Sequence, residues 1–250
     1  VSEYSDPQIQ KLDFAARGAG VMADLFRRRT RGLYRTTTSE LLDRDAIRPL
    51  WREYAAEAAR ELSWDVGPDD LVVMYLCGHG IRDRRTNEWY FVTADARYND
   101  LMNDRYDDLL SFDDLAMLGE LPCRKLAIID SCHSGAVQPV MRSDDLKAAM
   151  RMLQGDVVVT MTASEGEEEA AEQKDRQLGR FTSHLVDAFN GAADVDRDGI
   201  ITVRETVQHV VKAAAEDARA TGFVQHPTAG PADLLKTLEL PLTRHRAISE

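Results

Sequence analysis

Asp130-Ser131-Cys132-His133-Ser134-Gly135 comes directly after an apolar run, Lys125-Leu126-Ala127-Ile128-Ile129, which predicts a buried strand. A second apolar run, Leu71-Val72-Val73-Met74-Tyr75-Leu76, predicts another buried strand and leads into Gly78-His79-Gly80. In an open α/β sheet, sites form at the carboxyl ends of parallel strands, so we expect Cys132 and His79 to meet there. Because a thiol becomes a strong nucleophile when an imidazole takes its proton, the two residues predict a Cys/His catalytic dyad.

Strands and helices are expected to alternate along the chain. The predicted helices cover residues 9–28, 44–62, 180–190 and 203–216, with a short helix capped by Ser111, and the predicted strands cover 33–42, 71–76, 89–93, 125–129, 156–161 and 234–240. The polar segments 96–111 and 165–176 are expected to form surface loops. This alternation predicts a single α/β domain over residues 1–250, with an open, mostly parallel sheet and helices on both faces.

The composition argues against several classes of function. The chain has 250 residues, 44% of them hydrophobic, and a net charge of −12. No nucleic-acid partner is expected, because non-specific binding needs a basic face, and no apolar run is long enough to suggest a membrane partner. The spacing of Cys77, Cys123 and Cys132 is not that of a disulfide framework, which predicts a reducing, cytoplasmic location. Residues 1–4 are interpreted as the tail of a truncated first strand.

Other interpretations of the cysteine and histidine residues are open at this point. A cysteine after a buried strand is most often an inert small apolar residue, although the small residues after Cys132 favour an exposed turn. The glycines around His79 are expected to leave its ring uncrowded and to let a substrate approach the backbone N–H groups. Cys77, His79, Cys132 and His133 would alternatively form a tetrahedral zinc site, but their spacing is not usual for structural zinc.

The two strand ends resemble those of the caspase-like cysteine peptidases, in particular the metacaspase and bacterial caspase-homologue branch. The resemblance rests on Gly78-His79-Gly80 and on Asp130-Ser131-Cys132-His133-Ser134-Gly135, each following an apolar strand. It extends from residues 1–7 through 90–95 and Ser164 to Gly179-Arg180-Phe181-Thr182, and so covers nearly the whole chain. The Gln-Ala-Cys sequence of the animal caspases is absent.

This resemblance implies a role for each residue of the site. Cys132 would be the nucleophile, His79 the general base and acid, and the backbone N–H groups of Gly80 and Cys132 the oxyanion hole. Asp130 would lie in the primary specificity pocket, where a carboxylate selects Arg or Lys before the cut; a capping or turn role is the alternative. Cys77 would lie next to that pocket, where relatives commonly have serine. The chemistry requires no cofactor.

Tyr4 and Asp6 are further candidates for the specificity pocket, because the end of the first strand contributes to this pocket in the family.

A separate motif, residues 194–205, fits the twelve-residue calcium loop. Its proposed ligands are Asp194, Asp196, Asp198, Ile200 through its carbonyl, Thr202 and Glu205, with Gly199 at the sharp turn. The alternative is an Asp-rich turn that caps the next helix, since Thr202 and Glu205 also suit capping.

Residues 136–155 are expected to separate a large-subunit-like part, about 1–141, from a small-subunit-like part, about 152–250. Arg142, Lys147 and Arg151 in this segment would each satisfy a preference for basic residues, so we expect processing there. The sequence therefore predicts a cysteine endopeptidase that cuts protein or peptide substrates after Arg or Lys and is controlled by processing and calcium. Further expected partners are an upstream activating protease or a fused regulatory domain. The alternative is an inactive caspase-like module for calcium-responsive interactions.

Overall fold

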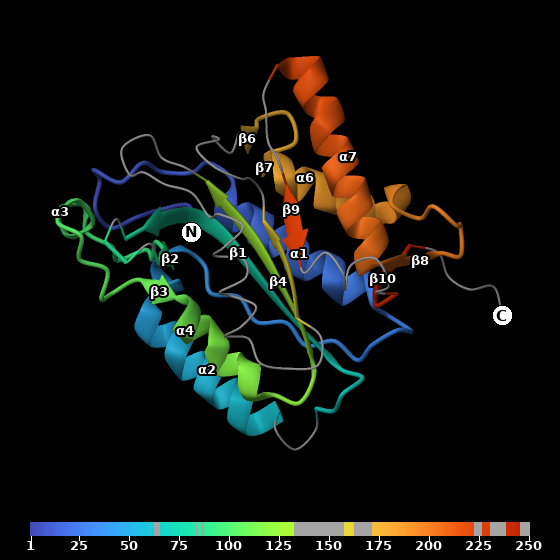
Figure 1. The fold of residues 1–250 in the computed structure, drawn as a ribbon, viewed down its shortest axis with the longest axis horizontal. Coiled ribbons are helices and arrows are strands. Elements are labelled where there is room, and N and C mark those ends of the chain that lie inside the picture. Colours follow the sequence, from blue (N-terminus) through green and yellow to red (C-terminus); the bar gives the residue numbers. More distant parts are fainter. Residues whose placement is uncertain are drawn as a thin grey trace.

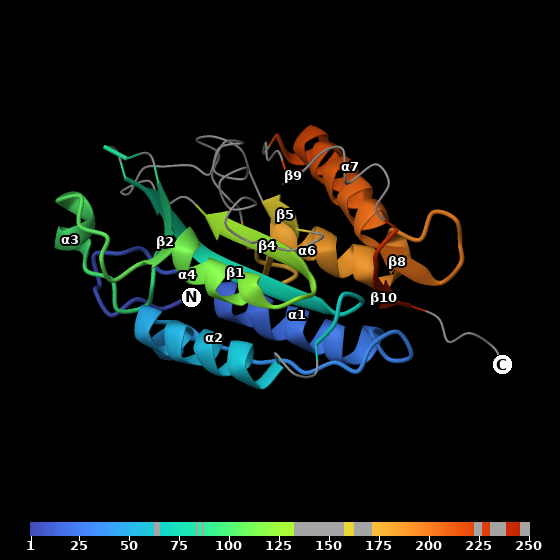
Figure 2. The same cartoon turned by 60° about the horizontal axis from the view of Figure 1, so that its bottom comes forward.

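The computed structural model of the protein describes residues 1–62, 66–83, 85–86, 88–132, 158–162, 172–222, 227–230 and 239–245. Only the backbone is described at Leu62, Glu120, Cys132, residues 158–162, Glu172 and Thr228. A central six-stranded sheet has helices on both faces, in three layers (Figure 1, Figure 2). The predicted α/β class is therefore confirmed.

The main sheet has the strand order β3-β2-β1-β4-β5-β9. Its strands are β1 (Leu71–Arg82), β2 (Trp89–Phe91), β3 (Leu110–Ser111), β4 (Arg124–Cys132), β5 (Val158–Thr162) and β9 (Thr228–Gly230). The central strands β1, β4 and β5 are parallel, whereas β2, β3 and β9 pair antiparallel at the two edges. The sheet is thus mixed, and its parallel part is the centre, where helices cover both faces and continuous apolar strands are buried.

Side chains alternate along β4 and divide the core into two halves. Ala127 and Ile129 face the layer formed by α2 (Arg48–Leu62), α4 (Phe112–Ala116) and η2 (Met117–Glu120). Leu126 and Ile128 face the layer formed by α1 (Ala15–Arg29), α6 (Arg180–Asp187) and α7 (Val203–Thr221). Because successive side chains of a strand point to opposite faces, one apolar run holds both helical layers in place.

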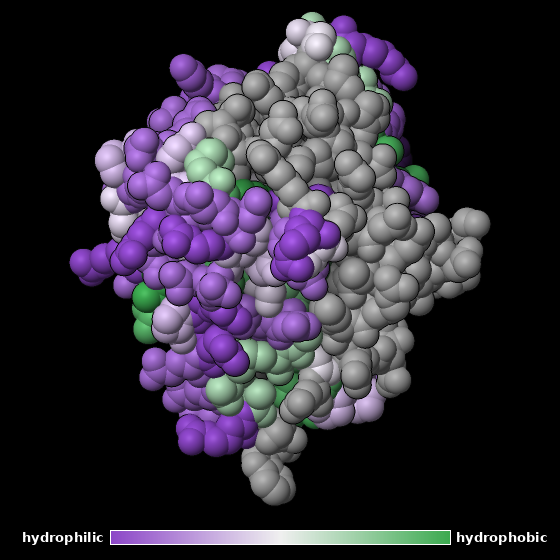
Figure 3. Space-filling view, turned by 60° about the vertical axis from the view of Figure 1, so that its left-hand side comes forward, coloured by the Kyte–Doolittle hydropathy of each residue, from purple (hydrophilic) through white to green (hydrophobic). Residues whose placement is uncertain are grey.

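Several small elements complete the described fold. They are η1 (Asp43–Asp45), α3 (Tyr98–Met102), the turn of π-helix η3 (Ala188–Ala192), and two short strand pairs, β6 (Glu172–Gln173) with β7 (Leu178–Gly179) and β8 (Ile200–Thr202) with β10 (Pro241–Arg244). None of the helices in the described ranges is long and apolar enough to cross a membrane. The described surface on the α3 side is mostly hydrophilic (Figure 3).

Some predicted elements are wrong. Residue 33 belongs to a turn and residues 34–42 have no regular secondary structure; their threonines favour a strand, but strand formation depends on neighbours to pair with. The predicted loop 96–111 contains α3 and β3, and the predicted helix 9–28 begins only at Ala15. Residues 1–4 are not a strand, although the amino group of Val1 donates to the Cys77 carbonyl. Of the predicted strand 234–240, residues 234–238 lie outside the described chain, and β10 begins at Pro241.

Candidate active site

His79 and Cys132 are direct neighbours across two parallel strands. The register between β1 and β4 makes His79 the Cα partner of Cys132 and Cys77 the Cα partner of Asp130. Adjacent strands lie about 4.8 Å apart, so the backbone alone brings the two residues of the predicted dyad side by side. Both residues belong to their strands rather than following them, because β1 continues through His79 to Arg82 and β4 ends at Cys132.

The ring of His79 is held by the N-terminal segment. Its Nε2 atom lies 2.7 Å from the carbonyl oxygen of Gln10, and its ring stacks on Tyr4 with centroids 5.2 Å apart and planes 17° from parallel. The backbone N–H of His79 donates to the Tyr4 hydroxyl at 3.0 Å. A carbonyl only accepts hydrogen bonds, so a neutral His79 carries its proton on Nε2 and its lone pair on Nδ1. This tautomer leaves Nδ1 as the basic nitrogen.

The expectation of an uncrowded His79 ring is wrong. Only 2% of the residue is exposed, and the glycines on either side make room for aromatic rings of the core. A Cβ atom at Gly78 would lie 2.8 Å from Cζ of Phe91, and one at Gly80 would lie 2.6 Å from Nε1 of Trp89. The absence of a side chain at these glycines therefore allows the aromatic side chains of β2 to pack directly against the backbone of β1.

Asp130 is buried, with 2% of its surface exposed, and a chain of hydroxyl groups leads to it. Oγ1 of Thr182 donates to Oδ2 of Asp130. Since the single proton of Thr182 is used there, the short contact between the Thr182 and Tyr75 hydroxyls makes Tyr75 the donor. Burial, followed by the nearby Cys77 and Asp130, raises the pKa of Tyr75 well above its ordinary value, which keeps that hydroxyl protonated.

Cys77, also predicted to lie at the specificity pocket, is buried and clusters with Leu12, which precedes α1, and with Ala15, the first residue of α1. Among the described residues, Cys77 forms no disulfide bond. Asp6, also a candidate for this pocket, uses its carboxylate to accept from the backbone N–H groups of Gln8 and Tyr98. Asp6 therefore shapes the local chain, while Tyr4 is the candidate that reaches the predicted dyad.

The structure brings together three of the six predicted calcium ligands. Carboxylate oxygens of Asp194, Asp196 and Asp198 lie within 4.8 Å of one another, and this is the one cluster of potential metal ligands found among the described residues. Thr202 and Glu205 instead form a capping box at the start of α7, as the alternative interpretation predicted. Burial alone would raise the pKa of Asp194, but its contacts with His245 and the N–H of Gly199 outweigh burial and lower it.

Several predicted residues lie outside the described part of the chain. They are the processing candidates Arg142, Lys147 and Arg151, the zinc candidate His133, and residues 165–171 of the acidic segment. The contribution of Gln10 to the site was not predicted, because a backbone carbonyl leaves no signal in a sequence. Thr182 lies in the segment that carries the family resemblance, but its contact with Asp130 depends on the packing of α6 against β4.

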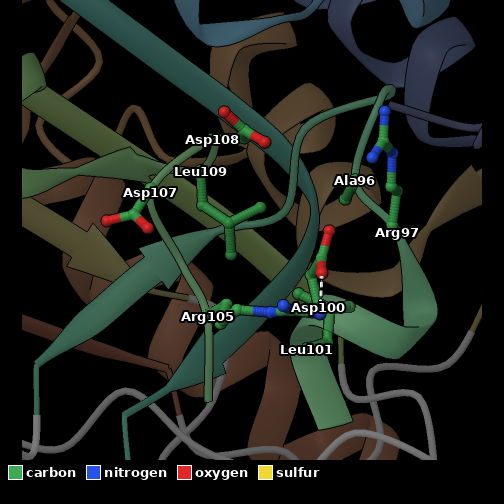
Figure 4. A pocket seen from close by; sticks show the side chains of 8 residues that line it. All are labelled: Ala96, Arg97, Asp100, Leu101, Arg105, Asp107, Asp108 and Leu109. Carbon is green, nitrogen blue, oxygen red and sulfur yellow. Dashed lines mark ion pairs between the residues drawn. The ribbon is translucent and has the colours of Figure 1, made fainter. Parts of the chain in front are cut away.

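A pocket of about 170 Å³ lies elsewhere, in the segment from Ala96 to Leu109 (Figure 4). Arg105 and Asp100 form an ion pair within it. None of its lining residues belongs to β1 or β4. This pocket is therefore separate from the site around His79 and Cys132.

Comparisons with known proteins agree with this architecture. The model of a family described as "Caspase domain" matches residues 2–239, and the chain therefore belongs to the caspase-domain family of peptidases. Membership of this family indicates a function of the cysteine-peptidase type. The resemblance to caspase-like peptidases that the two strand ends predicted is confirmed.

Two solved structures match the chain over most of its length. One is the crystal structure of protein GSU0716 from Geobacter sulfurreducens, with a TM-score of 0.60 and 18% identity over 98% of this chain and 96% of that chain. The other is the structure of pro-sf-caspase-1, with a TM-score of 0.48 and 12% identity over 92% of this chain and 86% of that chain. At such identities the likeness to the first structure shows the fold alone. No curated protein matches the sequence.

Proposed function

We propose that this protein is a cysteine endopeptidase that uses Cys132 and His79 to cut polypeptides after Arg or Lys. The observation that carries the proposal is the register that makes these two residues Cα partners. The contact between Nε2 of His79 and the Gln10 carbonyl supports it, since it selects the tautomer that a base needs. Gln10 is thus a positioning residue that acts through its backbone.

The proposed reaction proceeds by acyl transfer. The sulfur of Cys132 attacks the scissile carbonyl carbon while its proton passes to Nδ1 of His79. The N–H groups of Gly80 and Cys132 stabilise the negative oxygen of the tetrahedral intermediate. The C–N bond then breaks, and His79 protonates the leaving amine. Water, deprotonated by His79, attacks the thioester, which releases the carboxylic acid and restores the thiol.

The proposed preference for Arg or Lys rests on Asp130. The Thr182 hydroxyl that contacts this carboxylate carries no charge, and so it orients Asp130 without neutralising it. A buried carboxylate attracts a cation more strongly than an exposed one, because the local dielectric constant is lower. Asp130 precedes Cys132 by two residues in β4, which supports a role for this carboxylate near the proposed nucleophile.

The first experiment tests the dyad. Peptides with a fluorogenic group after Arg, Lys or Asp would be incubated with the wild type and with Cys132→Ala, His79→Ala and the matched control Cys123→Ala, which removes a buried cysteine away from the site. We expect turnover by the wild type and Cys123→Ala only, with losses of at least about 10³-fold in the two dyad variants. Equal turnover by Cys132→Ala would refute the proposed nucleophile.

A second experiment tests the specificity. Asp130→Asn keeps the shape of the side chain and its acceptor oxygen but removes the charge. We expect kcat/KM for Arg peptides to fall by roughly 10²-fold or more, as for the loss of a charge-assisted contact, while cleavage by Cys132 persists on other peptides. A preference for Asp peptides in the wild type, or an unchanged Arg preference in Asp130→Asn, would overturn the assignment of Asp130.

A further inference from the structure

Three acidic side chains gather in the loop that joins η3 to β8. One carboxylate oxygen from each of Asp194, Asp196 and Asp198 lies within 4.8 Å of the others. Gly199 adopts φ = +85°, and its N–H donates to Asp194 at 3.2 Å, while the N–H of Ile200 donates to Asp198 at 2.7 Å. These bonds explain how the loop turns, but they do not by themselves require a ligand.

Asp194 supplies the observation that points to a ligand. Its side chain is only 4% exposed. Its Oδ2 atom accepts from the N–H of Gly199 and lies 2.6 Å from Nε2 of His245. Its Oδ1 atom is buried and has no hydrogen-bond partner among the residues that the structure covers. A buried acceptor without a partner destabilises the fold, more so when the group is charged, and a bound cation would offset this cost.

We propose that Asp194, Asp196 and Asp198 bind a hard divalent cation, with calcium as the ion that fits best. Asp194 contributes Oδ1, so its contacts with Gly199 and His245 through Oδ2 are kept. Calcium takes six to eight oxygen ligands in flexible arrangements, and three carboxylates on a solvent-facing loop leave room for water to complete the shell. Asp196 and Asp198 are exposed, which gives the ion a path from solvent.

Glu205 limits the affinity of this site. Its Oε1 atom accepts from the N–H of Val195 at 3.2 Å, and its Oε2 atom accepts from the N–H and hydroxyl of Thr202. Both oxygens are therefore engaged in holding the loop and the start of α7. Without a bidentate glutamate, the site has one strong ligand fewer than the full twelve-residue loop, and we expect a dissociation constant of roughly 10⁻⁴–10⁻³ M.

The cation site is remote from the dyad. Strands β8 and β10 lie on the right in Figure 1 and Figure 2, whereas β1 and β4 point with their carboxyl ends toward the upper left. The ion is thus placed to stabilise the packing of β8, β10 and α7 rather than to take part in the chemistry. The site does not depend on peptidase activity, so it is best measured in protein that cannot cleave itself.

The test uses the 250-residue chain carrying Cys132→Ala. Calorimetry would measure its binding of calcium, and thermal unfolding would measure the effect of calcium on Tm. In this background Asp196→Asn and Asp198→Asn each keep an acceptor oxygen for the loop but lose a charge. Asp175→Asn removes an exposed charge from a different turn and serves as the matched control. Circular dichroism would establish that all four proteins are folded.

We expect one calcium site in Cys132→Ala and in the Asp175 control, with saturating calcium raising Tm by about 2–5 °C. Asp196→Asn and Asp198→Asn should each weaken binding by at least about tenfold, the effect of losing one carboxylate ligand. Absence of binding up to 10 mM calcium, a concentration about ten times the weakest expected dissociation constant, would overturn the proposal. Equal binding by all variants would also overturn it, because the ion would then be held by general surface charge.

Discussion

Trp89 packs so closely over Gly80 that it leaves no room for a side chain at position 80. A Cβ atom built at Gly80 would lie 2.6 Å from Nε1 and 3.0 Å from Cε2 of Trp89. Trp89 is itself 1% exposed and stacks on Phe112 with centroids 5.2 Å apart. The tryptophan is thus held from its other side and cannot move away easily, which makes Gly80 a packing requirement as well as a proposed oxyanion donor.

Gly80→Ala is therefore expected to destabilise the protein. Overpacking of this kind typically costs about 1–3 kcal/mol, and urea unfolding would measure the loss. Gly20→Ala in α1 is the matched control, because its Cβ would lie 3.7 Å from the nearest atom, an ordinary contact. There we expect no loss, or a gain of up to about 1 kcal/mol from helix propensity. Equal stability of the two variants would contradict the role assigned to Trp89.

Tyr4 is expected to matter for catalysis through its contacts with His79. Tyr4→Phe keeps the stacked ring but removes the acceptor of the His79 N–H, whereas Tyr4→Leu removes both contacts. We expect kcat/KM to fall by about fivefold in Tyr4→Phe, as for one hydrogen bond, and by a further factor of about 2–10 in Tyr4→Leu. Tyr90→Phe, at a tyrosine that stacks on Tyr106 instead, should leave kcat/KM unchanged. The reverse order of the two Tyr4 variants would exclude this role.

Thr182 is expected to orient the carboxylate of Asp130, which we propose selects Arg or Lys. Thr182→Val removes the donor to Asp130 and the acceptor of Tyr75, while Thr182→Ser keeps both. We expect KM for Arg peptides to rise by about tenfold in Thr182→Val with little change in kcat, corresponding to one lost hydrogen bond to a charged group. Thr182→Ser should restore the wild-type KM. If Thr182→Val changes only Tm, the residue has a structural role and this prediction fails.

Acid is expected to weaken the anchor between α2 and α4. Asp114 is 3% exposed and accepts from Nε of Arg48 and from the N–H and hydroxyl of Ser111. Burial alone would raise its pKa, but these hydrogen bonds and the charge of Arg48 outweigh burial and lower it. Since the folded pKa lies below the unfolded one, this stabilisation is present above the unfolded pKa, about 3.9, and is lost as the pH falls through the folded pKa.

The variant Asp114→Asn tests this anchor. It should lower the free energy of unfolding at pH 7 by about 1.5–3 kcal/mol, and the difference from wild type should shrink below about pH 4. Urea unfolding at several pH values measures both effects. Asp113→Asn, at an exposed neighbour, should change stability by less than about 1 kcal/mol. A deficit in Asp114→Asn that stays constant down to pH 2 would show that the carboxylate charge is not what stabilises the fold.

Processing is expected between the two halves of the chain. Arg142, Lys147 and Arg151 are the basic residues predicted as cleavage sites. Active protein should convert to two fragments on a denaturing gel, and cleavage should stop when all three residues are replaced by alanine. Cys132→Ala would distinguish cleavage by the protein itself from cleavage by another protease. Unchanged fragmentation of the triple variant would rule out all three positions.

Local sequence patterns predicted the elements that carry the site. Continuous apolar runs predicted β1 and β4 because parallel central strands are buried on both faces. Ser111 was predicted as a helix cap and forms a capping box with Asp114, since a capping residue acts on backbone groups three positions away. Local patterns failed at residues 33–42, where strand propensity had no partner strand to act with.

The sequence by itself thus determined the two strands that carry the proposed site residues His79, Cys132 and Asp130, because each strand is encoded by a continuous apolar run. Only the tertiary structure decided what holds these residues. The contact of His79 with Gln10 spans 69 positions and that of Asp130 with Thr182 spans 52. Such contacts depend on how the segment before α1 and helix α6 pack against the sheet, and a local sequence pattern contains no information on which distant segments meet.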